Sequence, residues 1–345
     1  MKPTQLPSGA WRCQVYLGRD PTGKKLFQSV TRPNKHDCII EAERISKHHH
    51  EILRDQSLLT LDEAITKYLE LKDGILSPST IRCYENIHKN HLQSLMPLRL
   101  RDLSKNIVQA ALNQEYKSNS PKTVKNTYRL LTAVLNQFTD SDLNIQLKEP
   151  EEREVNTLTE EQLLILILEL QGDRSEIPLL LALFLGLRRS EILALEHSDF
   201  DPATNILSIT KAKVPDKNNQ YVIKSTKTKK GRRKLLVPPY LAEKLKTCID
   251  QNIQFFNVSP ERPYRKLQYI CKKHNFPHMS MHNLRHQNAS IMLALNIPDK
   301  YALERGGWSS SSVMKNVYQH TMTQQRTKID QTINNYFEQL ISKIS

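Results

Sequence analysis

The second half of the sequence holds side chains that could attack a phosphodiester. His282 and Arg285 stand three residues apart in MHNLRHQNAS and would share one face of a helix. Arg188 lies upstream in LFLGLRRSEILAL, the lysine-rich turn STKTKKGRR follows it, and Tyr318 ends GGWSSSSVMKNVY. Guanidinium groups stay charged and match phosphate geometry, and an activated tyrosine hydroxyl is a nucleophile. These residues predict that the chain cuts and rejoins DNA through Tyr318.

Strand cleavage needs positive charge on the non-bridging phosphate oxygens, which a metal ion or guanidinium groups can supply. The sequence has neither an HExxH motif nor an acidic cluster at metal-binding spacing, so we expect the arginines to act without a metal or a cofactor. Preorganised donors of this kind typically contribute on the order of 10²–10³ in rate each. His48–His50 would point in different directions on a helix, which favours a solvated face over a metal site.

Each candidate residue also has a simpler interpretation. Arg188 could form a surface ion pair with Glu191, and Trp308 could be an ordinary core residue. A histidine on a helix is usually structural, which we expect for His286, and Tyr318 is one of twelve tyrosines. The joint pattern, rather than any single residue, favours the chemical interpretation.

The composition favours a polyanionic partner. The 345 residues carry a formal net charge of +14, with a pI of about 9.5, which is typical of proteins that bind nucleic acid or an anionic membrane surface. Residues 154–345 hold 27 Lys and Arg against 18 Asp and Glu, and residues 1–56 hold 10 against 6. With basic clusters at such a pI, nucleic acid is the expected partner.

The sequence indicates a cytoplasmic protein without membrane association. Its five cysteines are scattered and odd in number, which argues against a disulfide framework. The N-terminus MKPTQLPSGAW lacks the apolar run of a signal peptide. The longest apolar stretch, IPLLLALFLGL, is too short to span a bilayer and predicts a buried helix.

Residues 1–56 predict a small α+β domain. Two alternating runs flank the turn sequence DPTG, which predicts a hairpin. One face of this hairpin should be formed by Trp11, Cys13, Val15 and Leu17. A hairpin is marginal by itself, so we expect PTQLP to add a strand and KHDCIIEAERISKHHHEILR to form a covering helix. The apolar side of that helix should hold Ile39, Ile45 and Ile52.

Residues 58–145 predict a domain of four helices. Thr60 and Glu63 have capping-box spacing, Ser104 is a suitable N-cap, and Ser120 before Pro121 marks the start of the last helix. On that last helix, three basic residues share one face: Lys122, Lys125 and Arg129. This face is either a solvated salt-bridge surface or, as we prefer, a surface that grips DNA phosphates.

Residues 146–156 are polar, charged and contain a proline, so they predict a linker. Residues 157–345 follow as a mixed α/β domain. Helices are expected in TEEQLLILILEL and EIPLLLALFLGLRRSEILALE, and strands in NILSIT, YVIKST and RKLLVP. Further helices are expected in PPYLAEKLKTCIDQNI, YRKLQYICKKHN, SMHNLRHQNASIMLAL, DKYALERGG and SSSSVMKNVYQHT.

Four motifs, GLRRSE, TKT, HNLRH and GGW…VYQH, occur in the order found in tyrosine recombinases of the phage integrase family. The chain resembles that family over nearly its whole length. The resemblance implies a mainly α fold with small β elements: residues 1–56 look like an arm-site DNA-binding domain, residues 58–145 like the helical core-binding domain and residues 157–345 like the catalytic domain. It also implies that the two larger domains close around duplex DNA.

The resemblance assigns roles to single residues. Arg188 matches the arginine of the first family box, and His282 and Arg285 match the second. There the two arginines hold the phosphate and His282 accepts or shuttles the tyrosine proton. Lys227 matches the turn lysine that donates a proton to the leaving 5′ oxygen, and Tyr318 matches the nucleophile that forms a 3′-phosphotyrosyl link.

Four further positions lie beside or within these family motifs. Lys229 and Lys230 lie beside Lys227 and are expected to contact DNA. Trp308 stands where most members have histidine and some have tryptophan; its indole can donate one hydrogen bond to a phosphate oxygen but cannot exchange protons. Gln287 departs from the family, which usually has a small hydroxyl residue there.

The implied function is site-specific recombination that integrates and excises a phage or another mobile element. The expected partners are double-stranded DNA at core and arm sites, further copies of the chain in a tetramer, and host DNA-bending and excisionase proteins. The apolar stripe of residues 329–345 either packs on its own domain or docks on a neighbouring protomer. Two alternatives stay open: a type IB topoisomerase-like enzyme, and a non-catalytic DNA-binding regulator on a recombinase scaffold.

Overall fold

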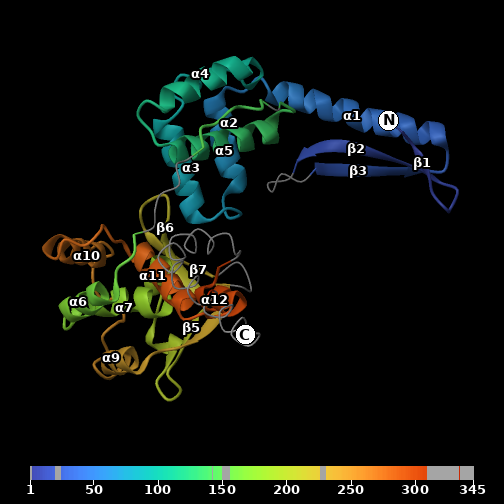
Figure 1. Cartoon of the computed structure of the whole chain (residues 1–345). Helices are drawn as coiled ribbons and strands as arrows, with labels where there is room; N and C mark the ends of the chain where they lie inside the picture. The colour runs from blue at the N-terminus through green and yellow to red at the C-terminus, as the bar shows by residue number, and fades with distance from the viewer. Residues whose placement is uncertain are drawn as a thin grey trace, which may run out of the picture. The chain divides into compact units, whose positions relative to one another are not determined.

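The computed structural model describes residues 2–19, 25–141, 143–149, 156–225, 231–308 and 334. The chain divides into two compact units (Figure 1). The first contains residues 1–151 together with 215–220, and the second contains residues 152–214 together with 221–345. No helix within the described ranges is both long and apolar enough to cross a bilayer.

The first unit begins with a three-stranded antiparallel sheet. Its strands are β1 (Thr4–Gln5), β2 (Trp11–Arg19) and β3 (Lys25–Arg32), in that order. Cys13 lies opposite Val30 in the register, and both side chains are buried. The hairpin and the additional N-terminal strand are thereby confirmed, whereas the DPTG turn lies outside the described residues.

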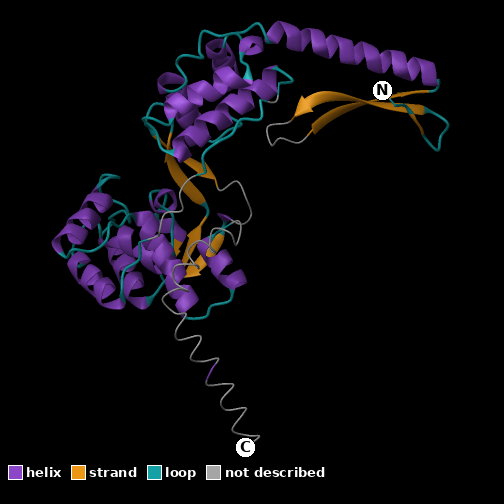
Figure 2. Ribbon diagram, turned by 45° about the horizontal axis from the view of Figure 1, so that its top comes forward, coloured by secondary structure: helices purple, strands orange, loops and turns teal. Residues whose placement is uncertain are grey.

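Helix α1 (Lys35–Gln56) covers one face of this sheet (Figure 2). The fully buried Cys38 and Ala42 are small enough to let the helix approach the strands closely. Ile39 and Ile45 pack at the edge of the same cluster. The prediction for Ile52 is wrong: its side chain is 40% exposed, because the buried contacts with the sheet belong to the part of α1 between Cys38 and Ile45.

Four helices complete the first unit, as predicted. They are α2 (Leu61–Lys72), α3 (Pro78–Asn90), α4 (Lys105–Glu115) and α5 (Pro121–Phe138), with the 3₁₀ turn η1 (Leu100–Asp102) before α4. Thr60 and Glu63 form the expected capping box, and the hydroxyls of Ser104 and Ser120 accept from backbone N–H groups of α4 and α5. Helix α5 has the largest buried side, which includes Val124, Leu130, Leu131 and Val134.

The second unit is built around α7 (Glu176–Leu185), which follows α6 (Glu160–Leu170). Helix α7 is buried on nearly all sides, as its apolar sequence predicted, and it packs along α11 (Met281–Ala294). The helix ends at Gly186, and α8 (Arg189–Ile192) begins only after two further residues. A helix through LFLGLRRSEIL is therefore wrong at this point, because Gly186 adopts a left-handed φ of 65°.

Small β elements and further helices complete the second unit (Figure 2). The antiparallel order β4–β5–β8 forms one sheet, and β6–β7 forms a separate two-stranded ribbon. The strands expected in NILSIT, YVIKST and RKLLVP are confirmed as β5, β7 and β8, whereas β4 and β6 were not predicted. The remaining bounds are η2 (His197–Asp199), β4 (Phe200–Asp201), β5 (Ile206–Ile209), β6 (Lys211–Pro215), β7 (Tyr221–Ser225), β8 (Arg233–Leu236), α9 (Pro239–Asp250), α10 (Arg262–Lys273) and α12 (Asp299–Gly306).

Candidate active site

The end of α7 sets the position of Arg188. Gly186 needs its left-handed conformation to stop the helix, and a Cβ there would lie 2.8 Å from Oδ1 of Asn288. Leu187 is then fully buried, so that Arg188 becomes the residue that caps α8. The backbone N–H of Arg188 donates to Glu191 at 2.9 Å, which caps the start of the short helix.

The Glu191 carboxylate is buried between two arginines. Its Oε1 accepts from Nη1 of Arg188 at 2.7 Å and from Nη1 of Arg233 at 3.1 Å. Its Oε2 accepts from Nη2 of Arg233 at 2.8 Å. Burial by itself would raise the pKa of the Glu191 carboxyl, but the hydrogen bonds and charges of Arg233 and Arg188 lower that pKa to about 2. Glu191 is therefore ionised throughout the neutral range.

Arg285, from α11, is 1% exposed and lies between two helix ends. Its Nη1 donates to the carbonyl of Gly186, and its Nη2 donates to the carbonyl of Gly306 at 2.7 Å. Trp308 covers it, with the guanidinium carbon 4.7 Å from the ring centroid. Burial, and then the charge of Arg188, lower the pKa of Arg285 to about 9, which leaves it charged at neutral pH.

Arg188, Arg233 and Arg285 all bond to the C-terminal end of α12. Helix C-terminal carbonyls lack partners within the helix and carry a partial negative charge, so cationic donors suit them. Three consecutive carbonyls each accept one arginine N–H: Arg305 from Arg233 Nε (2.9 Å), Gly306 from Arg285 Nη2 (2.7 Å) and Gly307 from Arg188 Nη2 (2.6 Å). One helix end thus positions groups from the start of α8, from β8 and from α11.

His282 and His286 lie one turn apart on α11. Their ring centroids are 4.3 Å apart, with the rings nearly perpendicular. His282 is exposed, whereas His286 is half-buried. Burial, followed by the charges of His282 and Arg285, lowers the pKa of His286 to about 4. A neutral His286 suits the structural role expected for it, and His282 is the more exposed histidine of this pair.

Gln287 fills a structural role beneath the site. Its side-chain oxygen accepts from the backbone N–H of Leu158 at 2.7 Å, and its side-chain nitrogen donates to the carbonyl of Leu158 at 3.1 Å. The long amide side chain both accepts from and donates to Leu158, so the departure from the family pattern supplies a tie between α11 and the segment before α6.

The structure brings Arg188, Arg285 and Trp308 together, with His282 one helical turn from Arg285. Lys227, Lys229, Lys230 and Tyr318 lie outside the described residues. The basic residues of α5 belong to the other unit: Lys122 and Arg129 are exposed, and Lys125 pairs with Glu149 at 3.3 Å.

Arg233 is a residue that the sequence analysis missed. It was part of an expected strand, RKLLVP, and carried no assigned role. Its alternation with Leu235 was the available signal, because both side chains are buried on one face of β8. A basic residue on the apolar face of a strand needs a buried partner, which Glu191 supplies at a separation of 42 residues.

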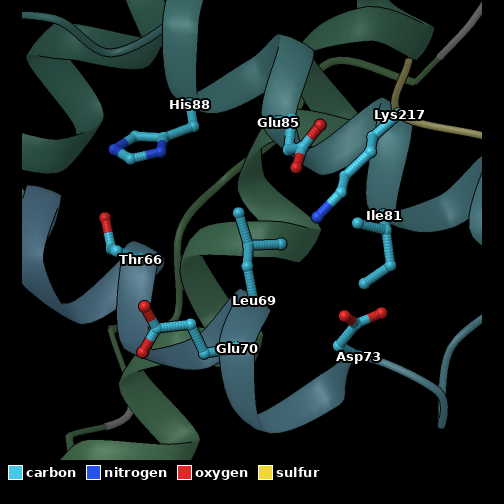
Figure 3. Close-up of a pocket in the computed structure, with 8 residues that line it drawn as sticks. All are labelled: Thr66, Leu69, Glu70, Asp73, Ile81, Glu85, His88 and Lys217. Atoms are coloured by element: carbon cyan, nitrogen blue, oxygen red, sulfur yellow. The ribbon is translucent and has the colours of Figure 1, made fainter. Parts of the chain in front are cut away.

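A separate pocket of about 280 Å³ lies in the first unit and contains none of the residues predicted to do chemistry. Its lining is Thr66, Leu69, Glu70, Asp73, Ile81, Glu85, His88 and Lys217 (Figure 3). Its three carboxylates make it unsuited to a phosphate. The arginine site in the second unit is therefore the better candidate for phosphodiester chemistry.

Known proteins are similar to this chain in sequence and in fold. The model of the phage integrase family matches residues 151–325. A XerC-like tyrosine recombinase of Caldanaerobacter subterraneus subsp. tengcongensis is 23% identical over 95% of this chain and 96% of its own length. The Tn1549 transposon integrase in complex with transposon right end DNA has a TM-score of 0.67 at 18% identity, covering 79% of this chain and 99% of that one.

A lambda integrase tetramer bound to a Holliday junction is also similar. Its TM-score is 0.55 at 17% identity, and the match covers 91% of this chain and 94% of that one. These likenesses agree with the mainly helical architecture and its small antiparallel sheets. From the family match and the arginine site, the chain belongs to the phage integrase family of tyrosine recombinases and is a tyrosine-type DNA strand transferase.

Proposed function

We propose that the chain is an integrase of a mobile element that cuts and rejoins DNA through a 3′-phosphotyrosyl intermediate on Tyr318. The observation that supports this most directly is the convergence of Arg188 and Arg285 on the end of α12, beside Trp308. The side chain of Arg188 is 39% exposed and engages two of its N–H groups in bonds to Glu191 and Gly307. A guanidinium has five such groups, so a phosphate can be bound as well.

In this mechanism the arginines hold the two non-bridging oxygens of the scissile phosphate. The oxygen of Tyr318 forms a bond to phosphorus while the bond from phosphorus to the 5′ oxygen breaks. Lys227 gives its proton to the departing 5′ oxygen, and His282 accepts the proton of the tyrosine. Because a free tyrosine has a pKa of about 10, the nearby cations and His282 are needed to make it reactive.

Rejoining reverses the same bonds. The 5′ hydroxyl of a partner strand attacks the phosphotyrosyl phosphorus, and the tyrosine oxygen leaves with a returned proton. The phosphodiester energy is kept in the covalent intermediate, so no external energy source is needed. Trp308 donates its indole N–H to a phosphate oxygen and takes no part in the proton transfers.

We also propose that α5 grips phosphates of the DNA backbone. Lys122 and Arg129 are exposed on this helix, and the half-buried Lys125 pairs with the exposed Glu149 at 3.3 Å. Exposed pairs of this kind contribute little, about 0–1 kcal/mol. A DNA phosphate can therefore replace Glu149 as the partner of Lys125 at low cost. Lys229 and Lys230 are proposed to contact the DNA strand beside Lys227.

The N-terminal domain, residues 1–56, is proposed to bind arm sites through the face of its sheet that α1 leaves uncovered. On that face, Arg12 lies opposite Thr31 and Gln14 lies opposite Ser29. The next pair, Tyr16 and Phe27, is partly exposed. A major groove admits a β-ribbon, and arginine, glutamine and hydroxyl side chains can read base edges there. Residues 58–145 would then hold the core site and residues 157–345 would carry out catalysis.

Assembly belongs to the same proposal. We expect a monomer in free solution and a tetramer on paired sites, with the tail of residues 329–345 docking on a neighbouring protomer. Host DNA-bending and excisionase proteins are the further partners proposed for integration and excision. Mass photometry of the protein with one site and with paired sites tests the tetramer, and a complex with two protomers on paired sites would contradict it.

A suicide substrate, nicked beside the attachment site, tests the chemistry. Wild type should accumulate a covalent protein–DNA adduct in the presence of EDTA, because guanidinium groups supply the charge. Tyr318→Phe should form no adduct at nearly unchanged DNA affinity, since only the nucleophilic oxygen is lost. Tyr301→Phe, on the exposed side of α12, is the matched control and should react like wild type.

The outcomes of that assay separate the alternatives. Binding without any adduct in wild type would indicate a DNA-binding regulator. An adduct that relaxes DNA but never exchanges strands would indicate a topoisomerase-like enzyme. An adduct formed by Tyr318→Phe would place the nucleophile at another tyrosine.

The arm-site proposal has its own experiment. Arg12→Ala combined with Gln14→Ala should weaken binding to arm-site DNA while cleavage of the core site stays the same. Lys47→Ala, which removes one positive charge from an exposed position on α1, is the control for charge alone. Equal arm-site binding by the two variants would show that the open sheet face does not read DNA.

A further inference from the structure

Arg233 stands between the candidate active site and the interior of the second unit. Its side chain is 3% exposed, compared with 39% for Arg188. Three of its nitrogen atoms donate within the protein: Nη1 and Nη2 to the two oxygens of Glu191, and Nε to the carbonyl of Arg305. A guanidinium buried in this way does not contact DNA, so Arg233 must act through the residues that it binds.

Glu191 is the first of those neighbours. Its carboxylate is 3% exposed and orients Arg188 twice, through the side chain at 2.7 Å and through the backbone N–H at 2.9 Å. A buried carboxylate is costly unless its charge is matched and its oxygens are hydrogen-bonded. The guanidinium of Arg188 is partly exposed and also bonds to the Gly307 carbonyl. Arg233 is therefore the partner that keeps the Glu191 carboxylate buried in one orientation.

The end of α12 is the second neighbour. Arg233 binds the Arg305 carbonyl at 2.9 Å, and Arg188 binds the Gly307 carbonyl two residues on, at 2.6 Å. Gly307 also lies close beneath both guanidiniums, since a Cβ there would be 2.8 Å from Nη1 of Arg233 and 3.5 Å from Nη1 of Arg188. The position of Arg233 therefore fixes both groups that the guanidinium of Arg188 contacts, the Glu191 carboxylate and the Gly307 carbonyl.

We propose that Arg233 is a positioning residue for strand cleavage, which holds Glu191 and the end of α12 so that Arg188 presents its free N–H groups to the scissile phosphate. The proposal rests on the phosphate-binding role proposed for Arg188. It assigns two functions to two neighbouring arginines: Arg188 binds DNA, and Arg233 determines where Arg188 lies.

Arg233→Met tests this assignment, with Arg232→Met as the matched control. Arg232 precedes it directly and is exposed, so the control removes the same charge from the same segment. Adduct formation on the suicide substrate should fall roughly 10- to 100-fold in Arg233→Met, because small misplacements of a catalytic group carry such costs. The DNA dissociation constants of the two variants should agree within about threefold, since phosphate affinity responds mainly to total charge.

The pH profile gives a readout that a purely structural residue would not change. Glu191 faces Arg188 from its own segment, Arg233 from β8 and, at longer range, Arg285 from α11. Loss of Arg233 removes the largest influence that lowers the pKa of the Glu191 carboxyl. The rate of adduct formation in Arg233→Met should then decline at a higher pH than in wild type, and Glu191→Gln in the same background should abolish that acid limb.

Arg233→Lys covers the case in which Arg233→Met fails to fold. It keeps the charge but cannot form the two-pronged contact with Glu191, so it should bind DNA like wild type and form the adduct at least several-fold more slowly. A rate equal to that of Arg232→Met, in folded Arg233→Met or in Arg233→Lys, overturns the proposal. If wild type itself forms no adduct, the proposed function has failed and not only the role of Arg233.

Discussion

The indole of Trp308 lies over the guanidinium of Arg285, 4.7 Å from ring centroid to guanidinium carbon. Trp308 is 7% exposed and Arg285 is 1% exposed, so each side chain forms a large part of the other's environment. A desolvated contact of this kind is worth about 2 kcal/mol. The tryptophan therefore covers Arg285, and the role proposed for its indole N–H as a donor to phosphate can be tested separately from that packing.

Trp308→Phe and Trp308→Ala should separate those roles. Phenylalanine keeps an aromatic cover but lacks the N–H, so we expect a stability near that of wild type and slower adduct formation. Alanine removes the cover as well and should destabilise the second unit by about 3–5 kcal/mol. Denaturant unfolding and the suicide-substrate rate measure the two effects. Equal rates for Trp308→Phe and wild type would remove the indole N–H from the mechanism.

Gly307→Ala should damage the site through both strain and collision. Its φ is 63°, and the added Cβ would lie 2.8 Å from Nη1 of Arg233. The left-handed conformation by itself costs about 1–2 kcal/mol, and the displaced arginines should slow adduct formation further. Gly172→Ala is the control, because Gly172 has a φ of 74° with nothing within 4 Å of the added atom. We expect Gly172→Ala to lose stability alone, with cleavage at the wild-type rate.

Gln287→Leu should loosen the segment that leads into α6. It leaves both the N–H and the carbonyl of the buried Leu158 without their present partner. Each unsatisfied group costs about 1–3 kcal/mol. Hydrogen exchange at the amide of Leu158 should speed up in Gln287→Leu, and Gln287→Glu, which keeps the acceptor for that amide, should show a smaller change. Unchanged exchange in both variants would mean that the two bonds do not hold the segment.

Acid should destabilise the second unit in two stages. The pKa of His286 is lowered to about 4, so the unfolded chain binds a proton that the folded chain refuses, and stability falls as the pH drops from about 6.5 towards 4. The pKa of Glu191 is lowered to about 2. The ionised Glu191 therefore stabilises the fold fully above about pH 4.5. This contribution to the free energy of unfolding, on the order of 3 kcal/mol, is lost as the pH falls towards 2.

His286→Phe isolates the first stage. Its unfolding free energy should be nearly independent of pH between 6.5 and about 5, above the range in which carboxyls titrate, where the wild-type value already declines, while His36→Phe, at an exposed position, should keep the wild-type slope. Denaturant midpoints across that range provide the measurement. An identical slope in His286→Phe and wild type would show that His286 is not kept neutral by burial.

Local sequence signals predicted much of the fold. Serine and threonine caps at Thr60, Ser104 and Ser120 mark helix starts through bonds that span only three residues. Alternation placed Cys13 and Val15 in the core of the sheet, because side chains of a strand point to opposite faces in turn. Family motifs supplied Arg188 and Arg285, which the structure places at the same helix end.

Long-range pairings were beyond such reasoning. The partner of Glu191 stands 42 residues away on another element, and the two bonds of Gln287 reach back 129 residues. Neither pair has a fixed spacing that a single sequence can reveal. The burial of Arg285 is of the same kind, since it depends on where the ends of α7 and α12 meet. The length of α1 likewise gave no sign that Ile52 would lie beyond the covered sheet.

Arg285 is bound by the terminal carbonyls of two helices, at Gly186 and at Gly306. The negative ends of two helix dipoles therefore already balance part of its charge before any DNA arrives. A cation neutralised in this way should bind small anions such as inorganic phosphate or chloride weakly. Their binding energy is too small to displace the Gly186 and Gly306 carbonyls from Arg285. A duplex brings many phosphates at once, and its remaining contacts can drive that exchange. We therefore expect Arg285 to respond little to small anions and to bind a phosphate only when other contacts already hold the duplex.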